Sequence, residues 1–321
     1  MMAIDDFLKR LIEEDDPLIV IWQQMLELYQ VDDFPSDLIR FYNERETRLS
    51  QLEEALYHGY WEIYDLLFQR SQAQSGDYVL ERLREGYVVI IADSLSLREV
   101  GIMGKLLNDL GWYIEEKTFA VASFPTLTES LSRILLGTTY PAGGKDVPAF
   151  RYRYVAGPGE VPNLPVGEPT LIWLRLPDKK LEQVTVAQVT TIADAFNATM
   201  ETLIQLLEQI TTRPVFITSD HGYLYATDIS HYWKMPGSIE KEVRKLFPRE
   251  SRAQPSDKEG MERLPYTKQG NQRYFVRNDT HVGILGRYWW ASAKPGDRCT
   301  AHGGLSLIET LVPAIKVRKI G

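Results

Sequence analysis

The stretch Arg213-Pro-Val-Phe-Ile-Thr-Ser-Asp-His-Gly222 decides the fold of this chain. Its apolar run, Val215 to Ile217, is closed by polar residues and a glycine, a pattern that predicts a buried strand. Asp220 and His221 directly follow this predicted strand. Ligands in an open α/β sheet bind just outside the carboxyl ends of the strands, so the two side chains are expected at a usual position for an active site. A carboxylate beside an imidazole suits zinc or manganese, although a helix-capping Asp and a packed His would give the same sequence.

Length and composition are those of an ordinary soluble protein. The 321 residues are 44% hydrophobic and 25% charged, and no apolar run approaches the length that crosses a bilayer. Cys299 is the single cysteine, so there is no disulfide framework, and the start of the chain lacks the regions of a signal peptide. We therefore expect a cytoplasmic protein that does not engage the membrane.

Charge is unevenly distributed along the chain, whose formal net charge is −8. Residues 1–85 carry 19 acidic and 8 basic residues, whereas residues 229–280 carry 7 acidic and 11 basic ones. An acidic chain is unsuited to broad, sequence-blind binding of duplex nucleic acid. The basic segment is compatible with a small anionic substrate.

Residues 1–85 are predicted to form helices that carry no catalytic residues. Apolar residues recur at intervals of three and four over residues 7–12, 22–29 and 49–56. An aromatic series with helical spacing, over residues 57–68, is typical of packing between helices. We therefore predict an N-terminal helical region that serves homodimerisation or docking to a protein partner.

From residue 86 onward, strands alternate with helices. Strands are predicted at 87–92, 117–123, 170–176, 213–218 and 283–290, helices at 97–110, 129–136 and 185–211, and a final helix and strand between 306 and 317. This alternation predicts an α/β fold, a doubly wound and mostly parallel sheet with helices on both faces, over residues 86–321. A Pro- and Gly-rich segment at about 138–168 and a polar, basic segment at 229–280 interrupt it, and we predict both as cap insertions.

Other predicted strand ends also carry polar residues. Four stretches stand at such ends: Ala92-Asp93-Ser94, Pro125-Thr-Leu-Thr128, Pro177-Asp178 and Thr218-Ser-Asp-His-Gly222. His302-Gly-Gly304 follows near the end of the chain. In this order they resemble the alkaline phosphatase superfamily, and most closely its PglZ domains, found in bacterial phage-defence and signalling proteins. The resemblance covers about residues 86–318. It implies a sheet of alkaline phosphatase type and two metal ions, usually zinc, that share phosphoryl transfer.

The resemblance also implies which side chains hold the metals. Asp93, Asp220 and His221 would hold one ion, and Asp178, Glu182 and His302 the other. Glu182 stands where phosphodiesterase relatives have the histidine of a Pro-Asp-x-x-Gly-His pattern, which here reads Pro177-Asp-Lys-Lys-Leu-Glu182. A carboxylate there shifts the preference of that site toward manganese or magnesium, whereas a solvated Glu182 would leave the site incomplete.

Thr128 is the nucleophile that the resemblance implies, at a predicted helix N-terminus where free N–H groups favour an anion. Thr126 is the rival hydroxyl, and as an N-cap it would have a structural role only. Ser94 is expected to cap the following helix. Arg98 could contact the substrate phosphate, although an exposed salt bridge on its helix is the preferred interpretation. Arg273 and Arg277 of the basic segment are weaker candidates for substrate contact.

The implied activity is that of a phosphodiesterase or phosphatase for nucleotides or short oligonucleotides, acting through a phospho-threonine intermediate. A non-catalytic PglZ module that binds a partner in a defence or signalling system is the main alternative. A phosphomutase would ordinarily carry more ligand histidines. A sulfatase would need Cys or Ser at Thr128.

Overall fold

The computed structural model describes eight ranges of the chain. They are residues 4–73, 75–165, 167–187, 189–210, 212–248, 251–265, 273–290 and 297–320. The last residue of the predicted 185–211 helix lies outside these ranges. Parts of both predicted insertions also lie outside them.

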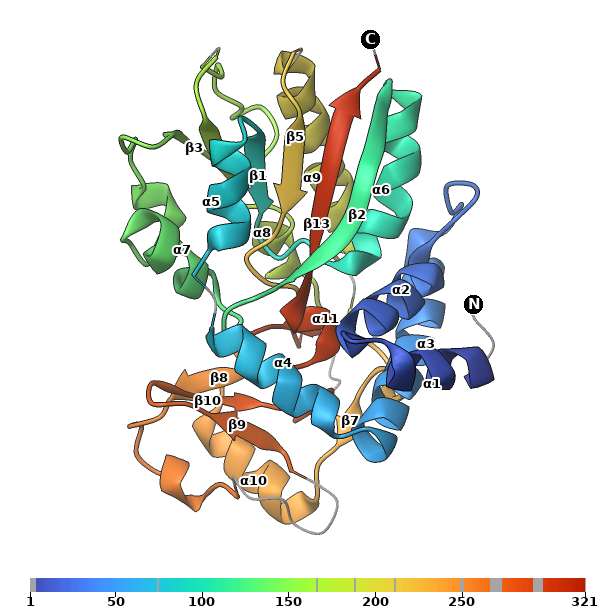
Figure 1. Ribbon diagram of the computed structural model, residues 1–321. Helices are drawn as coiled ribbons and strands as arrows, with labels where there is room; N and C mark the ends of the chain where they lie inside the picture. Colours follow the sequence, from blue (N-terminus) through green and yellow to red (C-terminus); the bar gives the residue numbers. More distant parts are fainter. Residues whose placement is uncertain are drawn as a thin grey trace.

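A six-stranded sheet forms the centre of the molecule (Figure 1). Its order is β2 (Trp112–Val121), β13 (Leu311–Lys319), β5 (Val215–Thr218), β1 (Val88–Ala92), β4 (Thr170–Leu174) and β3 (Arg151–Val155). β13 runs antiparallel to both of its neighbours, while β1, β3, β4 and β5 are mutually parallel. The mostly parallel sheet predicted from the sequence is therefore confirmed.

Helices cover both faces of this sheet because its central strands are apolar on both sides. In β1, Val88 and Ile90 pack into one core cluster, and Val89 and Ile91 into another. The first cluster includes α6 (Leu97–Asp109) and α9 (Ile192–Gln209), and the second includes α5 (Asp77–Arg84) and α7 (Thr128–Leu136). A continuous apolar strand such as β1 is typical of a sheet buried in this way.

The N-terminal helices are α1 (Ile4–Glu13), α2 (Pro17–Tyr29), α3 (Leu38–Gly59) and α4 (Glu62–Gln72). They share the first core cluster with the sheet. In α6, a Cβ added to Gly101 would lie 2.1 Å from the carbonyl oxygen of Tyr29, so α2 and α6 are in close contact. The helical prediction is confirmed, and these helices form part of the main core.

The prediction that residues 138–168 form a cap insertion is corrected by the structure. It contains a 3-10 turn at Pro141–Gly143 and then β3, which pairs in parallel with β4 at the edge of the main sheet. Tyr152 and Val155 of β3 are buried. The many Pro and Gly residues around this short strand obscured its pattern, so only the remainder of the segment is an insertion.

The segment at 229–280 combines with the following residues into a cap (Figure 1). The cap contains α10 (Gly237–Leu246) and an antiparallel sheet of β8 (Ala253–Pro255), β10 (His281–Ile284) and β9 (Phe275–Arg277). The single strand predicted at 283–290 is divided between β10 and β11 (Tyr288–Trp289), which pairs with β7 (Trp233–Lys234). Figure 1 shows the cap beyond the end of the sheet toward which β5 runs.

The remaining elements are short. They are α8 (Asp178–Leu181), β6 (Leu224–Tyr225), β12 (Thr300–Ala301), α11 (Leu307–Thr310) and 3-10 turns at Ile229–His231 and Met261–Arg263.

In the part of the chain that the structure describes, no helix has both the length and the apolar character needed to cross a bilayer.

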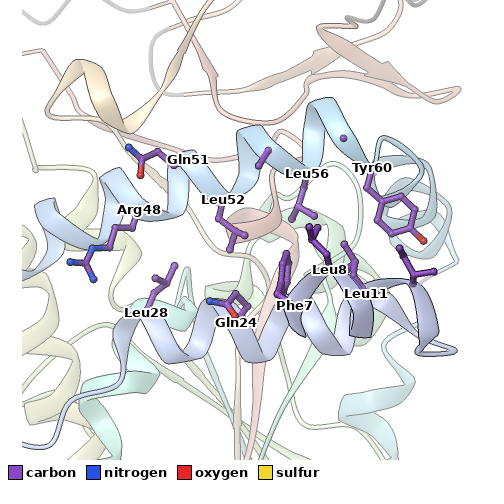
Figure 2. A pocket seen from close by; sticks show the side chains of 13 residues that line it. Phe7, Leu8, Leu11, Gln24, Leu28, Arg48, Gln51, Leu52, Leu56 and Tyr60 are labelled. Carbon is purple, nitrogen blue, oxygen red and sulfur yellow. The ribbon is translucent and has the colours of Figure 1, made fainter. Parts of the chain in front are cut away.

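A cavity of about 650 Å³ lies between α3 on one side and α1 and α2 on the other (Figure 2). Apolar side chains such as Phe7, Leu28 and Leu56 line it. The cavity lining contains none of the candidate metal ligands, so this cavity is separate from the site described next.

Candidate metal centre

Two neighbouring strands bring the first group of candidate ligands together. Asp93 follows β1 and Asp220 and His221 follow β5, and because these strands are parallel and paired, their carboxyl ends lie side by side. Ligand atoms of the three side chains lie within 4.8 Å of one another, and all three residues are buried. The structure therefore gathers the residues that the sequence assigned to one metal.

The orientation of His221 is fixed by a backbone contact. Its Nδ1 lies 2.9 Å from the carbonyl oxygen of Gly222, so Nδ1 carries the proton and donates it. The other ring nitrogen, Nε2, faces the carboxylates and lies 3.5 Å from Asp220 Oδ2 and 3.9 Å from Asp93 Oδ1. With Nδ1 bonded to the backbone, Nε2 is the nitrogen that His221 would offer to a metal.

The electrostatics of this group are compatible with a bound cation. Burial, followed by the charges of Asp220 and Asp178, raises the pKa of Asp93 well above its usual value. Asp220 Oδ2 is buried without a hydrogen-bond partner among the described residues. Buried carboxylates are normally paired or bound to a metal, so two carboxylates and an imidazole fit a divalent ion such as Zn²⁺ or Mn²⁺.

Thr128 lies beside this group, at the first residue of α7. Its Oγ1 is 3.2 Å from both Asp93 Oδ1 and His221 Nε2, and the residue is partly exposed. Thr126 is fully buried, where its Oγ1 donates to the carbonyl of Gly304 at 2.9 Å and accepts from the N–H of Gly303 at 3.0 Å. The geometry thus favours Thr128 over Thr126 as the hydroxyl available for chemistry.

Asp178 and His302 form a second pair next to the first group. His302 Nε2 lies 3.7 Å from Asp178 Oδ1, and the His302 ring stacks on that of His221 with centroids 4.2 Å apart. His302 Nδ1 donates to the carbonyl of Thr126 at 3.2 Å. Burial, then His221 and Arg298, lowers the pKa of His302 well below its usual value, so the ring is neutral at pH 7 and Nε2 is free to bind a cation.

Glu182 lies at the edge of this second pair. It is the C-cap residue of α8, and its half-exposed carboxylate is 3.7 Å from Arg175 Nη2. Burial and the charge of Asp178 raise the pKa of Glu182, which places the two carboxylates close enough to interact. Ligation by Glu182 remains a prediction.

The two arginines expected to contact substrate have other partners. Arg98 is fully buried, donating from Nη2 to Glu46 at 2.9 Å and from Nη1 to the carbonyl of Tyr223 at 2.8 Å. Arg273 pairs with Asp65 of α4 at 2.5 Å. The assignment of Arg98 is therefore corrected, because its buried pairing with helix α3 was not visible in the sequence, and substrate contact by Arg273 remains a prediction.

Ser94 was assigned the wrong role from the sequence. The cap of α6 is Ser96, whose hydroxyl and backbone N–H both bond the carboxylate of Glu99 in a capping box. Ser94 instead contacts Asp178, Asp220 and His221. Its position directly after Asp93 was the only sequence signal for this role.

Gly222 allows the His221 loop to approach α11. A Cβ added to Gly222 would lie 2.1 Å from the carbonyl oxygen of Ile308, a distance that requires the backbone to move. We predict that Gly222→Ala lowers the free energy of unfolding by about 1–3 kcal/mol or more, as overpacking does, and displaces His221. Urea denaturation measures the first effect and zinc titration the second. Gly59→Ala, whose added Cβ meets nothing within 4 Å, is the control that should leave both unchanged or slightly improved.

Neither a scan against known protein families nor a search of curated proteins found a match for this chain. The assignment of a function therefore depends on the geometry of the candidate metal centre and on the resemblance of the ordered motifs.

Proposed function

We propose that this protein is a metal-dependent phosphoric ester hydrolase, a phosphodiesterase or phosphatase of the alkaline phosphatase superfamily related to PglZ domains. One observation carries the proposal. The Thr128 hydroxyl lies 3.2 Å from two members of a buried ligand cluster, Asp93 and His221, at the N-terminus of a helix. A nucleophilic hydroxyl, a cation site and free helix N–H groups are the components of phosphoryl transfer.

In the proposed reaction, Thr128 Oγ1 attacks phosphorus, the bond from phosphorus to the ester oxygen breaks, and the proton lost by the hydroxyl ends on the departing alcohol. Water then cleaves the bond from phosphorus to Thr128 Oγ1 and regenerates the hydroxyl. This second step releases phosphate when the substrate is a monoester and a phosphate monoester when it is a diester. A divalent ion held by Asp93, Asp220 and His221 would lower the pKa of the attacking hydroxyl and balance the negative charge. Free N–H groups in the first turn of α7 would bind the phosphate oxygens. Asp178 and His302, with Glu182, would hold a second ion.

Nucleotides and short oligonucleotides are the proposed substrates. The support is the cap beyond the strand ends, whose segment 229–280 is basic in an otherwise acidic chain (Figure 1). A non-catalytic role as a binding module is the second candidate. It is favoured by one observation, the pairing of Glu182 with Arg175 at the edge of the second site.

Metal content and turnover of Asp220→Ala distinguish these two functions. We expect wild-type protein to contain stoichiometric divalent metal by mass spectrometry and to hydrolyse bis-p-nitrophenyl phosphate. Asp220→Ala should lose both, because it removes a buried carboxylate of the cluster whose Oδ2 has no hydrogen-bond partner among the described residues. Asp279→Ala, at an exposed position in the cap, is the matched control and should retain both.

The outcome for wild-type protein decides between enzyme and binding module. Wild-type protein with neither metal nor turnover would refute the enzyme and favour the binding module. Wild-type protein that contains metal but hydrolyses no phosphate mono- or diester would support the proposed metal site and refute the proposed hydrolase activity.

A further inference from the structure

We propose that Ser94 is a positioning residue that holds ligands of both candidate metal centres in their relative orientation. The inference rests on the proposed function, because it assumes that these side chains bind metal. It concerns a residue that the resemblance assigns to neither centre.

The backbone of Ser94 has an unusual conformation for a serine. Its φ is +66°, and it is the single non-glycine residue with positive φ among the residues that the structure describes. It is also fully buried. Left-handed backbone is unfavourable for residues with a Cβ, and such conformations persist where the surroundings enforce them, often at functional sites.

This turn directs two donors of one residue toward different carboxylates. The Ser94 backbone N–H donates to Asp220 Oδ1 at 3.1 Å, and its hydroxyl donates to Asp178 Oδ1 at 3.1 Å. Asp220 belongs to the first candidate centre and Asp178 to the second. Ser94 therefore connects the two centres directly.

The same hydroxyl oxygen also contacts an imidazole. Ser94 Oγ lies 3.3 Å from His221 Nδ1, the nitrogen whose proton is donated to the Gly222 carbonyl. The oxygen thus shares that proton while its own proton is directed to Asp178. Such contacts to metal ligands fix the histidine tautomer and the carboxylate orientation.

Other roles for this hydroxyl do not fit its surroundings. Ser96 and Glu99 already cap α6. As a nucleophile, Ser94 would need access to a substrate, whereas its side chain is fully buried. Orientation of Asp178, Asp220 and His221 is the function that accounts for all three contacts.

Two substitutions separate the hydroxyl from the backbone conformation. Ser94→Ala and Ser94→Gly both remove Oγ, but glycine adopts positive φ without strain. We expect both variants to bind Zn²⁺ about 10–100-fold more weakly than wild type, as losses of such contacts usually do. Ser94→Gly should have a higher Tm than Ser94→Ala. Titration of metal-free protein with Zn²⁺ in competition with a chromophoric chelator measures the affinity.

Ser96→Ala is the matched control, because it removes a nearby buried serine hydroxyl that caps α6 without contacting the candidate ligands. It should lower Tm and leave zinc affinity unchanged.

Each result bears on one claim. Zinc affinities of both Ser94 variants within twofold of wild type would overturn the Ser94 inference alone. Loss of affinity in Ser94→Ala but not in Ser94→Gly would also overturn it, because only the backbone would then matter. Failure of wild-type protein to bind zinc or another divalent ion would overturn the proposed function itself, whatever the variants do.

Discussion

Replacement of Thr128 by alanine is expected to reduce turnover of bis-p-nitrophenyl phosphate by roughly 10³-fold or more, the scale seen when a nucleophile is removed. The metal content should remain that of wild type, because the other groups around Thr128 Oγ1 are a carboxylate and an imidazole that stay in place, Asp93 and His221. This combination of retained metal and lost turnover separates a nucleophile from a ligand. Steady-state kinetics and metal analysis on the same preparation measure it.

Thr128→Ser is the matched control for this substitution, since it retains a primary hydroxyl at the same position and should retain measurable activity. A phosphoryl adduct trapped by rapid acid quench should map to the peptide that contains Thr128. Activity that survives in Thr128→Ala, or an adduct on a peptide without Thr128, would contradict the assignment.

Replacement of Glu46 by glutamine is expected to destabilise the fold by about 3–5 kcal/mol, the usual cost of breaking a buried ion pair from one side. Glu46 of α3 is fully buried and accepts from Arg98 at 2.9 Å and from Arg287 at 2.6 Å. Glutamine has a similar shape but no charge, so two buried guanidinium groups would lose their shared counter-ion. Urea denaturation at pH 7 measures the loss in unfolding free energy.

The pH dependence of this loss provides a second test. Although burial opposes ionisation, Arg98 and Arg287 lower the pKa of Glu46 to about 2. A carboxylate with a depressed pKa stabilises the folded state above its unfolded pKa of about 4.3, and that contribution disappears as pH falls toward the folded value. The difference between wild type and Glu46→Gln should therefore be full at pH 7 and shrink below about pH 4.

Glu44→Gln is the control for the Glu46 substitution. Glu44 is an exposed residue of the same helix that pairs with Arg40 at 2.9 Å, and exposed pairs contribute little to stability. A penalty for Glu46→Gln that is no larger than that for Glu44→Gln, or that does not change between pH 7 and pH 3, would refute the role given to Glu46.

The contacts of Glu46 also show that helix α3, one of the N-terminal helices, has a structural role in the main domain. Glu46 of α3 bonds Arg98 of α6 and Arg287, which lies between β10 and β11. Glu53 of the same helix accepts from the N–H of Leu307 at 2.7 Å, at the start of α11. Helix α3 therefore supports the elements that carry the site. Docking and dimerisation through this region remain predictions.

The sequence by itself predicted the central strands of the sheet and the polar residues that follow them. Continuous apolar runs such as Val88–Ala92 and Val215–Thr218 have few alternatives to a strand buried on both faces. Polar residues directly after such strands lie at one edge of a parallel sheet, which predicted a site there. The grouping of Asp93 with Asp220 and His221 was implied by the resemblance of the ordered motifs, and the structure brings these three side chains together. The local pattern of residues is sufficient to predict where a side chain lies when the strand that precedes it fixes its position.

Only the tertiary structure decided the features that depend on contacts between distant residues. The burial of Arg98 requires Glu46, which lies 52 positions away, and the edge strand β3 is defined by its pairing with β4. The left-handed conformation of Ser94 is held by bonds to Asp178 and Asp220. In each case hydrogen bonds between residues distant in the sequence stabilise the arrangement and offset the cost of burying polar groups, and no local pattern of residues encodes these bonds.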